Sequence, residues 1–224
     1  MVRACTAVLL AWLLLPGVAA CATGAGSVAY RGAISAENNA RFFARVSGRP
    51  LRLLLVDSSG GDVAAAIELG DWIHARQLDV TVTGVCLSSC ANYVFPAARH
   101  KEIKAGAIVA WHGNYHHLAL TGLWRDDVEL RMQRDGEDEQ TATRYVLAQV
   151  ARLVALERDF FARIGVDEQV CRVGKMPPYN VADYYFLSVA DMARFGITAV
   201  QAPDDYTATD MDGFAANIVY LQLE

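Results

Sequence analysis

The sequence lacks an excess of basic residues. Its 20 lysines and arginines stand against 25 aspartates and glutamates, and the formal net charge is -5. Proteins that bind nucleic acid rely on clustered lysine and arginine to neutralise phosphate, so this composition argues against a nucleic-acid partner. Internal repeats and long low-complexity segments are also lacking. With 54% apolar residues over 224 positions, the chain predicts one compact domain with a good core rather than a disordered protein.

The N-terminal region has no apolar run long enough to span a membrane, because its apolar stretch covers only residues 7–15. Arg3 precedes this stretch and small residues follow it, which is the layout of an export signal. The residues "VAAC" at positions 18–21 resemble the lipobox of bacterial lipoproteins, in which the cysteine is lipidated. This resemblance implies that residues 1–20 are a lipoprotein signal peptide and that lipid on Cys21 anchors the exported protein to the periplasmic side of a bacterial membrane. The alternative is an ordinary secretory signal cut near Ala20.

Cysteine is scarce. If the protein is a lipoprotein, Cys5 is removed with the signal peptide and Cys21 is lipidated. The cysteines that remain in the expected domain are then Cys86, Cys90 and Cys171. In an oxidising compartment one pair can form a disulfide and one thiol is left over. Cys86 and Cys90 are four residues apart, which permits a bridge only if the backbone turns between them. We expect one disulfide that includes Cys90, with Cys86 as its partner and Cys171 as a competing partner.

The rest of the chain alternates between strand-like and helix-like segments. The small residues at positions 21–27 predict a flexible tether, and residues 28–224 form the expected domain. Short apolar runs predict buried strands, and apolar residues at helical spacing, with Ser35 and Asp62 as caps, predict helices. This alternation is the βαβ pattern of an α/β fold with a mostly parallel sheet. The expected strands cover residues 28–35, 51–57, 78–84 and 107–113, and the expected helices begin at residues 36, 63 and 88.

The pattern changes in the second half of the chain. Residues 125–140 are mostly charged, which predicts a solvated connection or the solvated face of a helix. Apolar residues then recur at helical spacing from Val146 to Ile164, which predicts a long amphipathic helix that ends at Gly165.

Glycine and polar residues gather where the buried strands end. The loop "DSSGGD" at residues 57–62 opens a helix, where backbone N–H groups favour an anion or an oxyanion. The alternative for this loop is a plain strand-to-helix turn. Gly84 and Ser88 follow the next expected strand, and His112 ends the third. The ends of neighbouring parallel strands meet at one edge of a sheet, which is where such sheets place their sites.

These strand ends supply the parts of a nucleophilic hydrolase. A serine hydroxyl needs a base within hydrogen-bond reach and donors for the developing oxyanion. We therefore expect Ser88 as the nucleophile, His112 as the general base, and an oxyanion hole made by backbone N–H groups of Gly60 or Gly61 and of Ser89. The alternatives are that the two serines merely cap a helix and that the histidine is structural.

The order of these parts resembles the Clp protease and crotonase superfamily, in which "S-x-G-G" after a strand, "G-x-x-x-S" at a helix start and a later histidine form the serine-peptidase site. The segment "CLSSC" leading to "FPAARHKEIKAGAIVAWHG" is closer still to the exported Clp-protease-like proteins of bacteria. The similarity covers residues 28–200. It implies a spiral of βαβ units of the Clp protease and crotonase type, with a mostly parallel sheet and flanking helices. It also implies a homo-oligomer that acts on peptide or protein substrates.

The same resemblance implies a third member of the site. The segment "DYYFLSVADMARFGI", which begins at Asp183, is similar to the part of the family in which the acidic residue precedes a hydrophobic-Leu-Ser turn and a short helix. Asp183 is our choice for the group that orients His112. Asn180 is the alternative, reached by counting back from Phe186.

A metal site is a weaker interpretation of the same region. His112, His116 and His117 lie close together in the sequence, but Gly113 and Asn114 break any helix that would align them. No nearby cysteine or carboxylate completes a ligand set. We expect neither a metal nor a cofactor.

The sequence therefore predicts an exported, lipid-anchored hydrolase that acts on peptide or other acyl bonds through Ser88. Cys86 is an alternative nucleophile for the same histidine. The chief rival function is a catalytically silent scaffold or binding lipoprotein that keeps the fold and assembles with partners. A further rival is crotonase-like chemistry on a thioester, in which the loop N–H groups stabilise an enolate. The export signal argues against this chemistry, because coenzyme A substrates are cytosolic.

Overall fold

A computed structural model describes residues 26–209, 214 and 217–224. The expected signal peptide, Cys21 and most of the expected tether lie outside the described residues. Within these ranges, none of the helices is both long and apolar enough to cross a membrane.

A six-stranded sheet, in which every pairing is parallel, forms the centre of the protein. β3 forks, because its first half pairs with β4 and its last three residues pair with β5. The α/β class and the mostly parallel sheet expected from the sequence are confirmed. The strand order is β1 (Gly26–Arg31), β2 (Leu51–Ser58), β3 (Asp79–Leu87), β4 (Lys101–Ile103) and β7 (Val200–Gln201), with β5 (Ile108–Ala110) beside the end of β3.

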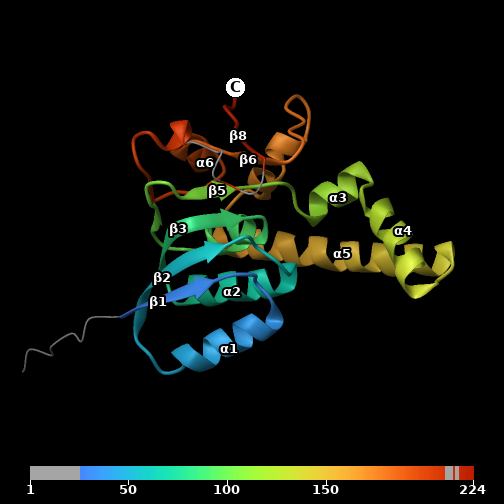
Figure 1. Ribbon diagram of the computed structural model, residues 1–224, viewed down its shortest axis with the longest axis horizontal. Helices are drawn as coiled ribbons and strands as arrows, with labels where there is room; N and C mark the ends of the chain where they lie inside the picture. Colours follow the sequence, from blue (N-terminus) through green and yellow to red (C-terminus); the bar gives the residue numbers. More distant parts are fainter. Residues whose placement is uncertain (1–25, 210–213, 215–216) are drawn as a thin grey trace, which may run out of the picture.

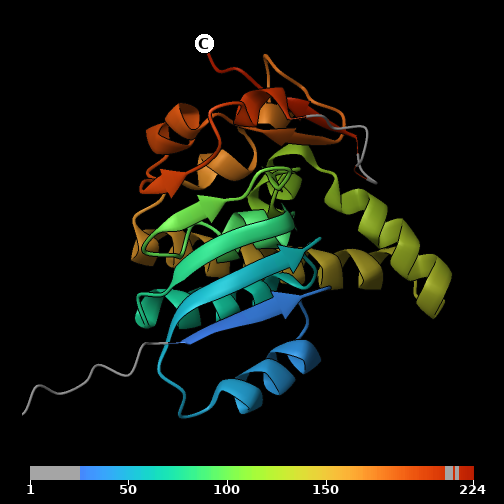
Figure 2. The same ribbon diagram turned by 60° about the vertical axis from the view of Figure 1, so that its left-hand side comes forward.

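Helices α2 (Val63–Ala75) and α5 (Glu139–Ile164) pack together against the sheet, and α1 (Ala36–Val46) lies beside β1 at one end of the molecule (Figure 1). At the opposite end lie α6 (Val189–Arg194) and a small parallel sheet of β6 (Tyr184–Phe186) and β8 (Ile218–Tyr220), as Figure 2 shows. α5 extends past the sheet and there contacts α3 (Tyr115–Thr121) and α4 (Trp124–Asp135). Single 3-10 turns cover Glu168–Cys171, Val173–Lys175 and Tyr206–Ala208.

The helix boundaries follow local capping chemistry. Ser35 Oγ accepts the N–H of Asn38 at 3.2 Å at the start of α1, and Asp62 Oδ1 accepts the N–H of Ala65 at 2.8 Å at the start of α2. These bonds satisfy N–H groups that the first helical turn leaves without a partner. Gly165 ends α5 with a φ of 69°, a conformation that glycine adopts easily. The two predicted helix starts and the predicted helix end are confirmed.

The helix predicted from residue 88 is wrong in kind and in length. A single π-helical turn, η1 (Cys90–Val94), forms there, and the N–H of Phe95 donates to the carbonyl of Cys90 at 3.0 Å. Pro96 has no N–H with which to continue the helix. All residues of η1 are buried, so this segment is part of the core rather than an amphipathic surface helix.

Other segments differ from the expectation in their extent. The strand predicted over residues 78–84 continues to Leu87, so Gly84 lies inside β3 and not after it. Most of the charged segment 125–140 belongs to α4, which ends at Gly136, and to the start of α5. β4, β6, β7 and β8 are only two or three residues long, too short for an alternating pattern to reveal them in the sequence.

Two clusters of buried apolar side chains hold these elements together. The larger one fills the space around the sheet and includes the fully buried Trp111, Tyr93 and Phe160. The smaller one joins α4 to the first half of α5. Because the larger cluster includes η1 and β5, the core holds the segment that follows Ser88 and the strand that precedes His112.

Candidate active site

The candidate nucleophile lies in a tight turn between β3 and η1. Ser88 has a φ of 54°, in the left-handed region that residues other than glycine mostly avoid. Its N–H donates to the carbonyl of Ala110 at 3.2 Å, and its own carbonyl accepts the N–H of Asn92 at 2.9 Å. A left-handed serine costs roughly 1–2 kcal/mol, and such backbone outliers cluster at functional sites.

A disulfide brackets this turn. Cys86 in β3 and Cys90 in η1 are bonded to each other, with their Cα atoms 5.1 Å apart and both side chains fully buried. Cys171 keeps a buried thiol, and burial raises its pKa well above the usual value. The alternative of Cys86 as the nucleophile is wrong, because its sulfur is already bonded. The bridge instead limits the conformations open to Ser88.

A bulge in β3 determines where the turn leaves the sheet. The register between β2 and β3 shifts after Val56, and pairing resumes only at Cys86. Gly84 lies in this bulge, where an added Cβ would be 2.6 Å from Asp57 Oδ1. The same oxygen accepts the N–H of Val85 at 3.0 Å. The Asp57 carboxylate therefore fills the bulge, and only glycine leaves room for it at position 84.

The candidate base follows β5, in a short antiparallel contact with β6. Trp111 and Tyr185 exchange backbone hydrogen bonds of 2.8 and 2.9 Å. The next residue is His112, and its Nε2 lies 2.7 Å from Ser88 Oγ. A serine hydroxyl donates to a neutral imidazole nitrogen at such a distance. Two residues expected to act together from their sequence positions thus lie within hydrogen-bond reach.

The surroundings of His112 favour its neutral form. The pKa of His112 lies below its usual value, chiefly because neighbouring protein atoms desolvate the imidazole even though the side chain keeps solvent access. The charge of Lys175 lowers this pKa further, whereas the Asp183 carboxylate acts in the opposite direction. The imidazole is therefore neutral near pH 7 and able to accept the Ser88 proton.

Neither candidate for the third member hydrogen bonds to His112. Asp183 is near enough to raise the His112 pKa, but its Oδ2 accepts the backbone N–H of Asn217 at 3.3 Å. Asn180 is exposed, and its amide donates to the carbonyl of Pro178 at 3.5 Å. Among the described residues, the hydrogen bond of the imidazole goes to the serine and none goes to a carboxylate. An acidic group that orients the base stays a prediction.

The side chain that lies against His112 belongs to Tyr184, which the sequence analysis missed. The two ring centroids are 4.6 Å apart, and the ring planes are inclined by 32°. Burial raises the pKa of Tyr184, the Asp183 charge raises it further, and the Ser88 hydroxyl acts against this rise. The only signal in the sequence was a position next to Asp183. The antiparallel contact at Trp111, which selects the residue that faces the base, is a tertiary feature.

The glycine loop after β2 approaches the nucleophile turn very closely. Gly60 has a φ of 92°, and an added Cβ would lie 2.7 Å from the carbonyl oxygen of Leu87 and 2.9 Å from both Ser88 Cβ and Ser89 N. A side chain at this position would displace the backbone that carries the candidate nucleophile.

Of the three candidate oxyanion donors, Gly60 is already occupied, because its N–H donates to Ser58 Oγ at 3.1 Å. In the part of the chain that the structure describes, the N–H groups of Gly61 and Ser89 donate to no protein acceptor. Ser89 Oγ donates to the carbonyl of Gly61 at 2.8 Å, which connects the glycine loop to the turn that carries Ser88. The hydroxyl of Ser89 is therefore already hydrogen bonded. Gly61 and Ser89 thus remain as donors for an oxyanion.

A buried carboxylate connects the segments that follow the two candidate catalytic residues. Glu157, fully buried in α5, accepts the hydroxyl of Tyr93 in η1 at 2.5 Å. It also accepts the N–H groups of Tyr115 and His116, at the start of α3, at 3.0 and 3.1 Å. Burial raises the Glu157 pKa, and these hydrogen bonds act against the rise. One side chain therefore holds both η1 and α3 against α5.

The histidines of the "HGNYHH" segment have separate surroundings. His116 Nδ1 lies 2.5 Å from Glu168, whereas His117 is buried and desolvation lowers its pKa. Over the described ranges, no group of three or more histidine, cysteine, aspartate or glutamate side chains is arranged to hold a metal ion.

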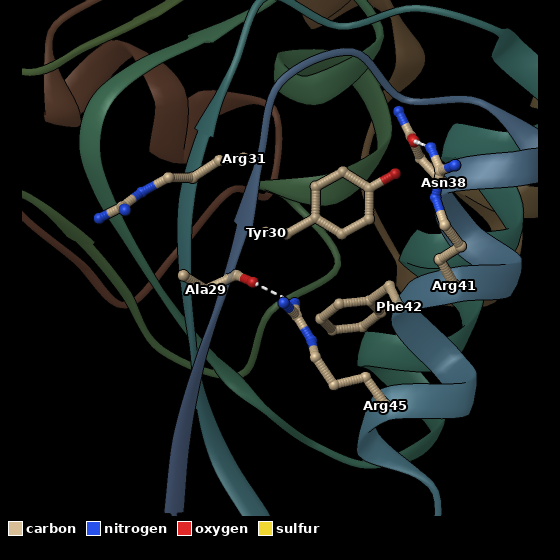
Figure 3. A pocket seen from close by; sticks show the side chains of 7 residues that line it. All are labelled: Ala29, Tyr30, Arg31, Asn38, Arg41, Phe42 and Arg45. Atoms are coloured by element: carbon tan, nitrogen blue, oxygen red, sulfur yellow. Dashed lines mark hydrogen bonds between the residues drawn. The ribbon is translucent and has the colours of Figure 1, made fainter.

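A groove of about 410 Å³ between β1 and α1 lies apart from this site (Figure 3). Arg45 reaches across it and donates to the carbonyl of Ala29 at 2.8 Å, and Arg41 on its rim pairs with Glu37. The groove shares no residue with the Ser88 turn or with His112. Arg45 covers a carbonyl on the outer edge of β1, which is a common way to protect an edge strand.

No protein-family model and no curated protein matches the chain. The resemblance to the Clp protease and crotonase superfamily therefore depends on the short sequence motifs around Ser88 and His112 alone.

Proposed function

We propose that this protein is a serine hydrolase of the Clp protease type that cleaves peptide or other acyl bonds through Ser88. The observation that carries the proposal is the 2.7 Å separation of Ser88 Oγ and His112 Nε2, with the serine in a left-handed turn. Serine hydrolases can present their nucleophile on a strained strand-to-helix turn, and strained residues cluster at functional sites.

In this mechanism, the Ser88 proton passes to His112 Nε2 as Oγ attacks the substrate carbonyl carbon. The carbonyl oxygen becomes an oxyanion that accepts hydrogen bonds from the N–H groups of Gly61 and Ser89. His112 then gives the proton to the leaving group, which departs and leaves an acyl-enzyme. A water molecule, activated by the same imidazole, releases the acid and restores the serine. Loss of one oxyanion donor typically costs about 10²–10³-fold in rate.

The proposed setting is the periplasmic side of a bacterial membrane, with the protein anchored by lipid on Cys21 and assembled as a homo-oligomer. The support is the lipobox-like sequence, together with a disulfide, which persists in oxidising compartments. Cys21→Ser should release the protein into the soluble periplasmic fraction. Mass spectrometry that finds unprocessed, unmodified Cys21 in membrane-bound wild type contradicts the anchor.

A fluorophosphonate probe, which reacts with serine hydrolases, tests the hydrolase proposal directly. Wild type should be labelled, whereas Ser88→Ala and His112→Ala should lose labelling by several orders of magnitude. Ser47→Ala is the matched control, because Ser47 is an exposed serine between α1 and β2, at the end of β2 opposite the loop that carries Gly60 and Gly61. The labelling rate should fall at acid pH with a midpoint below 6.5, because protonated His112 accepts no proton. Turnover of a peptide library then separates peptidase from other acyl chemistry.

A silent scaffold or binding lipoprotein is the second candidate. The observation that favours it is that His112 hydrogen bonds to no carboxylate within the described residues. A folded, disulfide-intact, assembled wild type that shows no labelling and no turnover would support this candidate against the hydrolase.

A further inference from the structure

The ring that faces His112 comes from β6, and the backbone register explains why. Trp111 and Tyr185 pair in antiparallel register, so the adjacent residues His112 and Tyr184 lie opposite each other on the other side of the contact. Both pairs of rings approach closely, with centroids 6.2 Å apart for the first pair and 4.6 Å apart for the second. The buried pair fixes the register, and the register brings Tyr184 against the imidazole.

We propose that Tyr184, rather than Asp183 or Asn180, is the positioning residue that holds His112 toward Ser88. This inference rests on the proposed hydrolase function. The tyrosine ring lies against the imidazole and restricts its rotation, while Nε2 stays 2.7 Å from the serine oxygen. In serine hydrolases the orienting group hydrogen bonds to the far nitrogen of the base. Here an aromatic contact takes over the orienting role.

The proposed role needs the ring of Tyr184 and not its hydroxyl. A tyrosine is protonated near pH 7, and burial and the neighbouring Asp183 raise the pKa of this phenol further. During the reaction the Ser88 proton moves to His112, and Tyr184 neither gains nor loses a proton. The tyrosine therefore acts through its position and not as an acid or a base.

Besides the neutral Tyr184 ring, several titratable groups lie near the imidazole. Lys175 lowers the His112 pKa, Asp183 raises it, and His117 on α3 is close enough to interact with His112. Lys175 Nζ donates to the carbonyls of Ala182 and Asp183, which ties this cation to the segment before β6. Variants that change a ring without changing a charge are therefore needed to isolate the tyrosine.

The test combines NMR titration of His112 with fluorophosphonate labelling. Tyr184→Phe keeps the ring, so the titration midpoint should be unchanged and labelling should stay within about threefold of wild type. Tyr184→Ala exposes the imidazole, so the midpoint should rise by about half a pH unit or more, and labelling should slow by at least about tenfold. Tyr220→Ala is the matched control, because it removes a ring from β8 that lies against Phe186 instead of His112.

Asp183→Asn tests the acidic alternative. Because Asp183 raises the His112 pKa, its loss should lower the midpoint while labelling stays within about tenfold of wild type. The inference is overturned if Asp183→Asn reduces labelling by about 10⁴-fold, as for an orienting carboxylate, while Tyr184→Ala leaves labelling and midpoint unchanged. If wild type is not labelled at all, the hydrolase proposal fails, but the NMR titration still tests whether Tyr184 positions His112. An unchanged His112 midpoint in Tyr184→Ala then overturns the role of Tyr184.

Discussion

Gly60→Ala should disturb the nucleophile turn from the opposite loop, and its magnitude follows from the geometry. An alanine Cβ would lie 2.7 Å from the carbonyl oxygen of Leu87 and 2.9 Å from Ser89 N, so the backbone on one side has to move. A left-handed alanine costs roughly 1–2 kcal/mol, and overpacking adds typically about 1–3 kcal/mol. The free energy of unfolding should therefore fall by about 2–5 kcal/mol.

Gly32→Ala is a close control for this substitution. Gly32 has a φ of 85°, near the 92° of Gly60, but an added Cβ would meet nothing within 4 Å. The control bears only the backbone cost of roughly 1–2 kcal/mol. The difference between the two variants then measures the close approach of Gly60 to the Ser88 turn.

Urea unfolding gives the free energies, and the rate of fluorophosphonate labelling reports on the turn. Gly60→Ala should unfold at a lower urea concentration than Gly32→Ala, with a labelling rate reduced by more than about tenfold, because small displacements at a nucleophile cost about 10²-fold. Equal unfolding midpoints and equal labelling rates for the two variants would refute the close approach on which the oxyanion geometry depends.

Three further perturbations have outcomes that the structure specifies. Replacing Cys86 and Cys90 with alanine should lower the free energy of unfolding by about 2 kcal/mol, the value for so short a loop; equal urea midpoints for variant and wild type contradict this. Burial lowers the Lys101 pKa from 10.5 to about 8, so between these values the unfolded chain binds a proton that the folded chain has released. As the pH rises across this range, the free energy of unfolding of wild type should increase by on the order of 3 kcal/mol in all, and that of Lys101→Met should not. Parallel profiles of unfolding free energy against pH for the two proteins would exclude the buried, deprotonated lysine. Glu157→Gln should cost about 1–3 kcal/mol, because an amide cannot accept all three hydrogen bonds that the carboxylate accepts; an unchanged thermal midpoint rejects that role.

Much of the secondary structure was predictable because it depends on neighbouring residues. Ser35 and Asp62 cap their helices, and Gly165 ends α5, through contacts within a few residues of sequence. The apolar run from Leu51 is a strand for the same reason. The segment after Ser88 misled the prediction, because its apolar residues pack on all sides as one π turn and Pro96 prevents a longer helix.

The candidate site was predictable in its parts but not in its assembly. The positions of Ser88 and His112 at strand ends indicated that they would meet, since parallel strands bring those ends to one edge of the sheet. The choice between Gly60 and Gly61 depended on one hydrogen bond, which the Gly60 N–H donates to Ser58 Oγ and which no spacing reveals. The bulge that accommodates the Asp57 carboxylate opposite Gly84 was equally hidden.

The sequence by itself determined the α/β class, the main helix ends and the pairing of a serine with a histidine, because composition, periodicity and capping act locally along the chain. Only the tertiary structure decided which side chain faces His112. That choice depends on the register between Trp111 and Tyr185, which are 74 positions apart, and a shift of one residue would have presented a different side chain. Register is set by the packing of the whole core, so the side chain that lies against His112 is Tyr184.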